Sequence, residues 1–266
     1  LHRNKKSIIQ NKVIGNTLLL TINNASKRNS MIKGFHDEFQ KSIIDAEENR
    51  DIFSIVVNGA GDFFCAGGDL NALQTRRTMT EEQKYETISQ LKRTINSLFN
   101  GSKPIIAAVE GGAAGAGVSL AMACDMVIMS EHSFFSLAYV KIGLTPDGAA
   151  TKFLSEAMPR QMLAEMAMLG GKIDASRLYQ IGAINGISQK GNAMQTAIEL
   201  SKNFERLPKN SLARIKKLTR HAYGNNFESQ LNLETDFMVL SQGDSESIEG
   251  IDAFLEKRAP DYKKLR

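Results

Sequence analysis

The chain of 266 residues has no tryptophan, two cysteines and four histidines. The cysteines form no C-x-x-C pair, which argues against a disulfide framework. Cys65 and Cys124 each lie among apolar or small residues, so we expect two buried, reduced thiols. The histidines lie far apart, without H-E-x-x-H or a similar spacing. No metal site is therefore expected.

Long apolar runs are also missing. No uninterrupted run approaches the ~20 residues of a membrane helix, so no membrane partner is expected. The first ten residues carry basic side chains without the apolar region of a secretory signal. The closing Lys264-Leu265-Arg266 does not fit the peroxisomal S-K-L pattern, and the cytoplasm is the expected location.

The excess of positive charge is small. Lysine and arginine exceed aspartate and glutamate by 33 − 29 = +4, and the isoelectric point is about 9.0. Such a balance fits a solvated surface or an anionic small molecule as well as it fits nucleic acid. We expect no nucleic-acid partner.

What the sequence does contain is an alternation of strand and helix patterns in its first two thirds. Apolar periodicity predicts strands over 7–14, 17–22, 54–58, 126–129 and 134–137, with a weaker signal at 185–188. It predicts helices over 34–48 and 80–100, and then over 192–206, 208–220, 226–240 and 245–257. This order indicates an α/β protein with an all-helical tail.

One face of the last predicted helix is apolar, with Ile248, Ile251, Phe254 and Leu255 at helical spacing. Such a face normally packs on its own core or on a neighbouring subunit.

The most informative segment is 103–125, KPIIAAVEGGAAGAGVSLAMACD. An apolar strand runs into glycine and alanine residues and then into an apolar helix, so free backbone N–H groups and a helix N-terminus meet there. This arrangement can hold an anionic oxygen, although glycines also serve tight turns and close packing. A dinucleotide fingerprint fits poorly, because Gly115-x-Gly117 lacks the third glycine.

Several motifs together resemble the crotonase superfamily, the enoyl-CoA hydratase/isomerase group. They are NNASKRNSM, FFCAGGDL, the segment just described continued to MVIMSEHSFF, IGLTPDGAAT and FLEKRAPDY, in the family's order over roughly residues 7–262. The resemblance implies a spiral of β-β-α turns over 1–190 that binds acyl-CoA, and a helical trimerisation region over 191–266. It also implies a homotrimer or a dimer of trimers. The only cofactor implied is the coenzyme A of the thioester substrate.

The resemblance assigns roles by motif position. The backbone N–H groups of Gly68 and Ala116 are expected to form an oxyanion hole for the thioester carbonyl, which agrees with the anion site read from the residues. The backbone at Ala66 is expected to contact adenine. Lys27 or Arg28 is expected near the CoA phosphates, or else in a solvated loop.

Further positions follow from the same motifs. Phe254 and Lys257 are expected to reach the CoA of an adjacent subunit, with packing as the alternative for Phe254. Asp69 and Leu70 are expected beside the substrate, although Asp69 also fits a helix cap. Residues 71–80 and the start of the long helix are expected to wall the acyl pocket.

Hydratases of this family use two glutamates, and the corresponding positions here are Ser119 and Tyr139. Neither side chain is a carboxylate base at neutral pH, because both hydroxyls remain protonated. Ser119 is therefore expected to line the pocket or its helix. Tyr139 is expected to bond the acyl group or to form an apolar wall. Glu110 could serve as a second acid, but a solvent or oligomer contact is the simpler interpretation.

Asp147, in LTPDGAAT, is the expected acid and base. Single-carboxylate isomerases of the family place Asp or Glu in this turn, and one carboxylate can move a proton between two carbons while the oxyanion hole holds the enolate. The competing interpretation is a helix N-cap in an ordinary Pro-Asp-Gly turn. The sequence thus predicts an enoyl-CoA or ring isomerase. The alternatives are a hydratase, an oxepin-CoA hydrolase type of enzyme, and a catalytically silent CoA-binding scaffold.

Overall fold

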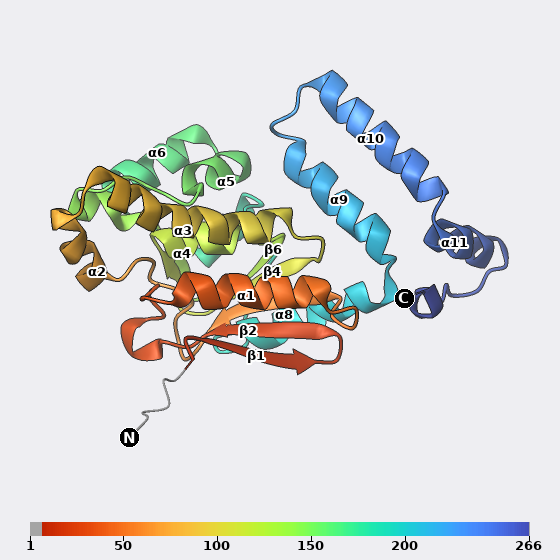
Figure 1. The fold of residues 1–266 in the computed structure, drawn as a ribbon, viewed down its shortest axis with the longest axis horizontal. Helices are drawn as coiled ribbons and strands as arrows, with labels where there is room; N and C mark the ends of the chain where they lie inside the picture. Colours follow the sequence, from red (N-terminus) through yellow and green to blue (C-terminus); the bar gives the residue numbers. More distant parts are fainter. Residues whose placement is uncertain (1–6, 266) are drawn as a thin grey trace.

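A six-stranded sheet forms the centre of the molecule, in the order β1-β2-β3-β4-β6-β9 (Figure 1). The computed structural model describes residues 7–265. β1 is antiparallel to β2, and every other neighbouring pair is parallel. The strands are β1 (Ile9–Ile14), β2 (Thr17–Ile22), β3 (Ser54–Gly59), β4 (Ile105–Val109), β6 (Met126–Ser130) and β9 (Gly186–Ser188).

Both faces of the inner strands β2, β3 and β4 are buried, which explains why these strands are mostly apolar, whereas the edge strand β1 is largely exposed. Side chains alternate between the faces of a strand. Leu18 and Leu20 of β2 accordingly join the larger apolar core, whereas Leu19 joins a smaller core on the other face. Parallel strands covered on both faces read as continuous hydrophobic runs for this reason.

Helices cover the two faces unequally. α1 (Phe35–Glu48) and α3 (Glu81–Asn100) contribute apolar stripes to the larger core, and α8 (Ala193–Ser201) packs on the smaller one (Figure 1). α1 begins one residue later than its predicted range, and α3 matches its predicted range apart from the N-cap Thr80. The predicted boundary at residue 190 assigns α8 to the tail, although α8 packs directly on the sheet.

A second, three-stranded sheet lies beside the first, with β7 between β5 and β8. β7 (Phe134–Ser136) lies in a predicted strand, whereas β5 (Ala113–Ala114) lies in the predicted glycine and alanine turn and β8 (Lys172–Asp174) in a stretch without a predicted strand. Three residues are too few to show a period, and β8 is defined only by its pairing with β7. The surrounding helices are α2 (Leu70–Thr75), α4 (Ala116–Met122), α5 (Ala150–Ala157), α6 (Arg160–Leu169) and α7 (Ala175–Gln180).

The helical tail is confirmed. α9 (Lys209–His221), α10 (Phe227–Gln242) and α11 (Ser245–Leu255) each lie within two residues of a predicted range. The predicted helix over 192–206 is α8 continued by a 3-10 segment, Lys202–Arg206. Figure 1 shows α9 between α10 and the core.

Charged side chains fasten α9 to the core. Lys216 and Arg220 project from α9 onto Asp125, with nitrogen–oxygen distances of 2.9 Å and 2.6 Å. Their side chains are only 5% and 9% exposed, so both cations depend on the one carboxylate for compensation. Asp125 also accepts the Ile105 amide at the start of β4.

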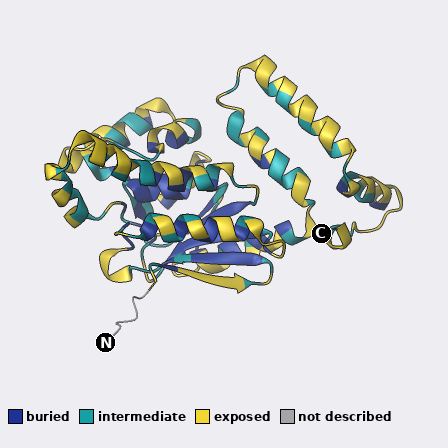
Figure 2. Ribbon diagram, viewed as in Figure 1, coloured by how far each residue is buried: buried dark blue, intermediate teal, exposed yellow. Residues whose placement is uncertain are grey.

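The apolar face of α11 does not pack on the chain's own core. Ile248, Ile251, Phe254 and Leu255 are between 58% and 83% exposed, in a tail that is largely exposed (Figure 2). The sequence offered two partners for this face, the chain's own core or a neighbouring subunit. The structure rules out the first.

We predict that Asp125→Ala lowers the free energy of unfolding by ~3–5 kcal/mol, because it leaves Lys216 and Arg220 buried without a counter-charge. Urea denaturation followed by circular dichroism measures the change. Lys41→Gln is the control, since its ion pair with Asp45 is exposed and should contribute at most about 1 kcal/mol. If both variants lose the same small amount of unfolding free energy, the ion pairs of Asp125 with Lys216 and Arg220 do not anchor the tail.

Candidate functional site

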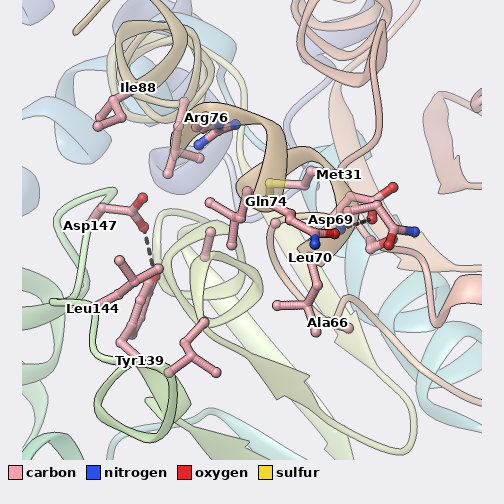
Figure 3. Close-up of a pocket in the computed structure, with 18 of the residues that line it drawn as sticks. Met31, Ala66, Asp69, Leu70, Gln74, Arg76, Ile88, Tyr139, Leu144 and Asp147 are labelled. Atoms are coloured by element: carbon pink, nitrogen blue, oxygen red, sulfur yellow. Dashed lines mark hydrogen bonds between the residues drawn. The ribbon is translucent and has the colours of Figure 1, made fainter. Parts of the chain in front are cut away.

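A pocket of about 1220 Å³ opens between three parts of the chain (Figure 3). One wall is formed by α2, the 3-10 segment Arg76–Thr78 and the first half of α3. The floor comes from the two glycine-rich turns, 66–69 and 114–116. The third side is the segment 138–147, which follows β7. Residues between 71 and 77 and the first half of α3 line this pocket, as expected of them, and that it holds the acyl group stays a prediction.

The two glycine-rich turns lie against each other. The Ala114 amide donates to the Cys65 carbonyl at 3.0 Å, and Cys65 and Ala113 form a parallel bridge. Gly67 has φ +85°, and a Cβ there would lie 2.7 Å from the Ala114 oxygen and 3.0 Å from the Ala116 nitrogen. Only glycine permits this approach, because such a contact leaves no room for a side chain.

The amides of Gly68 and Ala116 border the pocket at this contact. Among the backbone hydrogen bonds found outside regular elements in residues 7–265, neither amide donates to a protein acceptor. Ala116 is the first residue of α4, where N–H groups have no partner within the helix. Two unpaired donors on adjacent turns can bind one oxygen atom that carries negative charge.

Asp147 faces the pocket from the loop before α5, and Tyr139 lies beside it. The Tyr139 hydroxyl donates to Asp147 Oδ1 at 2.6 Å (Figure 3). The phenol is therefore committed to the carboxylate in this structure, rather than being an apolar wall.

Ser119 does not line the pocket, contrary to expectation. It is fully buried, and its hydroxyl donates to the Asp147 carbonyl at 2.9 Å. A Cβ at Gly148 would lie 2.9 Å from the Ser119 Cβ, so the loop rests directly on α4. Ser119 thus holds the backbone of the Asp147 loop against α4.

The N-cap interpretation of Asp147 is wrong. α5 begins at Ala150, its N-cap is Ala149 at φ +61°, and no side chain caps it. Only the backbone carbonyl of Asp147 accepts a helix amide, that of Ala150. The carboxylate is therefore left to the pocket and to Tyr139.

Asp69 and Asp147 are the two carboxylates among the described residues that line the pocket, and their environments differ. Burial raises the pKa of Asp147 above its ordinary value, while the Tyr139 hydrogen bond and the Arg76 charge oppose this rise. The pKa of Asp69 is lowered, first by Lys27, whose ammonium lies 2.9 Å away. Asp69 also caps α2 through the Asn71 amide, as the sequence suggested.

Positive charge predominates at the pocket surface. Five cationic side chains line it, namely Lys27, Arg76, Arg77, Lys84 and Lys141. Such an excess favours an anionic ligand. Arg28 is not among the lining residues, and its guanidinium lies over the Phe63 ring instead. Of the two predicted phosphate contacts, only Lys27 is in a position to face the pocket.

The remaining predicted positions divide into two groups. Ala66 and Leu70 line the pocket. Phe254, on α11, and Lys257, just after it, do not line the pocket of their own chain, and their predicted contact with an adjacent subunit stays a prediction. Glu110 also lies outside the lining, where it accepts the Gly191 amide at 3.0 Å.

Sequence reasoning missed His36 and Arg76. His36 is half-buried on α1, and burial, aided by the charges of Arg76 and Arg93, lowers its pKa to about 4. Its Nδ1 lies 2.9 Å from the Thr94 hydroxyl. Neither residue belongs to a motif, so no signal in the sequence could have separated them from structural or solvated side chains.

Both cysteines are buried and free, as predicted, and burial raises the pKa of each thiol to about 12. Over residues 7–265 we find no group of three His, Cys, Asp or Glu side chains arranged to hold a metal ion. No helix in that range is both long and apolar enough to cross a bilayer.

Comparison with known proteins places the chain among acyl-CoA enzymes. A family model described as enoyl-CoA hydratase/isomerase matches residues 13–265. The 1,2-epoxyphenylacetyl-CoA isomerase of Escherichia coli is 31% identical over 252 residues, covering 92% of this chain and 94% of that protein. The 2,3-dehydroadipyl-CoA hydratase of the same organism is 28% identical, with the same coverage.

The fold agrees with these matches. An enoyl-CoA hydratase structure from Polaromonas sp. superposes with a TM-score of 0.92 at 38% identity, over 95% of this chain and 98% of that one.

The close contact between the two turns can be tested by substituting Gly67. Gly67→Ala should destabilise the protein more than Gly182→Ala, and it should also weaken acyl-CoA binding. Both glycines have positive φ, which costs an alanine ~1–3 kcal/mol, but a Cβ at Gly182 meets no atom within 4 Å. Denaturation and calorimetric titration with a saturated acyl-CoA measure the two effects. Indistinguishable variants would contradict the requirement for close approach.

Proposed function

Because the chain belongs to the enoyl-CoA hydratase/isomerase family, we propose that it isomerises an acyl-CoA thioester, with Asp147 as both base and acid. The observation that carries this proposal is the unequal pair of carboxylates in the pocket. Asp69 is neutralised by Lys27 and is a poor base, whereas Asp147 has a raised pKa and a hydroxyl as its hydrogen-bond partner.

In this proposal the amides of Gly68 and Ala116 donate to the thioester carbonyl oxygen. Proton loss from Cα moves negative charge onto that oxygen, where the two N–H groups stabilise it. Donors fixed by the backbone need no reorganisation during the reaction, and each contributes about 2.7–4 kcal/mol in comparable sites. The contact at Gly67 supports this role, since it holds the two amides on one side of the pocket.

The proton transfer needs only one carboxylate. Asp147 removes a proton from Cα, and the electrons of the broken C–H bond delocalise onto the thioester oxygen to give a dienolate. The same carboxyl returns the proton at Cγ, which leaves the double bond between Cα and Cβ. The double bond moves and no atom is gained or lost. A raised pKa suits this double role, because it brings the acid form closer to neutral pH.

Hydration would require a second positioned acid or base for the attacking water. Ser119 is buried beneath the loop, and Tyr139 is engaged by Asp147. Burial first, and then the Asp147 charge, raise the pKa of Tyr139, so its phenol stays protonated. These positions favour isomerisation over water addition. Oxygen derived from solvent in the product would instead favour a hydratase or hydrolase.

We also propose that further copies of the chain cover the exposed apolar residues of α10 and α11, as in the trimers implied by the resemblance. Met238, Val239 and Leu240 of α10 are between 55% and 64% exposed, next to the exposed face of α11. Phe254 and Lys257 would then approach the pocket of a neighbouring copy.

Asp147→Asn should reduce isomerisation of a 3-enoyl-CoA by ~10²–10⁴-fold, because an amide cannot accept the Cα proton. Binding of a saturated acyl-CoA should remain close to that of the unaltered protein, as shown by calorimetry. Asp51→Asn, on an exposed loop, is the control and should keep full activity. Isomerisation that survives the loss of the Asp147 carboxylate would exclude the mechanism.

Tyr139→Phe should move the acid limb of the kcat/KM profile to higher pH. The hydroxyl lowers the pKa of Asp147 by stabilising its carboxylate, so its removal raises that pKa and requires a higher pH for the ionised base. Rates over a pH series on the 3-enoyl-CoA measure the shift. An unmoved limb with a raised KM would show that Tyr139 contacts the substrate instead.

A further inference from the structure

Arg76 differs from Lys27, because no carboxylate pairs with it. Lys27 is paired with Asp69, but over residues 7–265 we find no ion pair or hydrogen bond of the Arg76 side chain. Arg76 is nevertheless only partly exposed. A guanidinium carries five N–H donors, and withdrawing it from water without an acceptor is costly. The side chain is therefore suited to an anionic group of the ligand.

The position of Arg76 indicates which part of the ligand it would meet. Figure 3 shows Arg76, Ile88 and Asp147 at one side of the pocket, with Ala66 and Asp69 at the other. In the proposed reaction the CoA moiety lies on the side of Ala66, and the thioester carbonyl lies over the two turns. The acyl chain then extends past Asp147 towards the wall that carries Arg76.

The charge of Arg76 acts across this end of the pocket. It lowers the pKa of Asp147, in the loop before α5, and also that of His36, on α1. His36 is neutral at pH 7 and adds no positive charge of its own. Lys84, in the first turn of α3, lines the same pocket and has no ion-pair partner in the described part of the chain. The wall formed by α3 and the segment before it is therefore cationic.

We propose, on the basis of the function proposed above, that the preferred acyl group carries a carboxylate at its distal end and that Arg76 binds it. The planar guanidinium can donate two parallel hydrogen bonds to a carboxylate. Ile88 and Leu91 of α3 line the pocket and would contact the methylene groups. The substrate class is thus the CoA monothioesters of dicarboxylic acids.

Adipyl-CoA and hexanoyl-CoA test this proposal by calorimetric titration. The two acyl chains have equal length, and neither can isomerise, so binding is measured without turnover. The unaltered protein should bind adipyl-CoA ~10–100-fold more tightly, as expected for hydrogen bonds to a charged group. Equal affinity, or tighter binding of hexanoyl-CoA, would overturn the proposal.

Two variants test whether Arg76 causes the preference for adipyl-CoA over hexanoyl-CoA. Arg76→Gln should weaken adipyl-CoA binding by ~10–100-fold and leave hexanoyl-CoA within about twofold. Arg93→Gln removes the same charge from the outer side of α3, where Arg93 pairs with Glu86, and it should change neither affinity. A loss for Arg76→Gln that is equal for both thioesters and for free CoA would show that Arg76 binds CoA phosphates, which overturns the proposal.

The experiment separates this proposal from the reaction itself. A preference for adipyl-CoA in a protein that does not isomerise enoyl-CoA would support the role of Arg76 and contradict only the proposed reaction. Failure of both thioesters to bind would overturn the carboxylate site together with the acyl-CoA function.

Discussion

The close contact between two glycine-rich turns is the constraint on which the site depends. Gly117 lies so near the other turn that a Cβ would meet the Cys65 carbonyl at 2.2 Å, and a Cβ at Gly67 would meet the Ala114 carbonyl at 2.7 Å. This contact brings the amides of Gly68 and Ala116, far apart in the sequence, to one pocket. The buried parallel strands behind them keep both turns in place.

In the proposed function, the chemistry and the acyl specificity belong to different parts of the fold. The turns and the Asp147 loop belong to the packed core. Ser119 and Gly148 hold the loop on α4, and Tyr139 donates to the Asp147 carboxylate. The opposite wall, built by α2 and α3, contributes side chains such as Arg76 and Ile88. In this arrangement, one core could serve different acyl groups when the wall changes.

Much of the site could be predicted because its residues lie in motifs. Gly68, Ala116 and Asp147 were found from their turns, and the structure brings all three to one pocket. Of the two expectations for Ser119, pocket lining failed because the motif marks a position on α4 and does not show which way the side chain points. The competing cap interpretation of Asp147 failed because α5 begins three residues later, after Gly148 and Ala149 at positive φ.

The sequence by itself determined the α/β core, the helical tail, the family and the position of the candidate carboxylate, because each depends on local pattern or a contiguous motif. Only the tertiary structure decided the partners of that carboxylate. The Tyr139 hydrogen bond, the charge of Arg76 and the burial of Asp147 arise between segments distant in the chain. Distances and burial set the pKa of a group, and neither is encoded in any single stretch of residues.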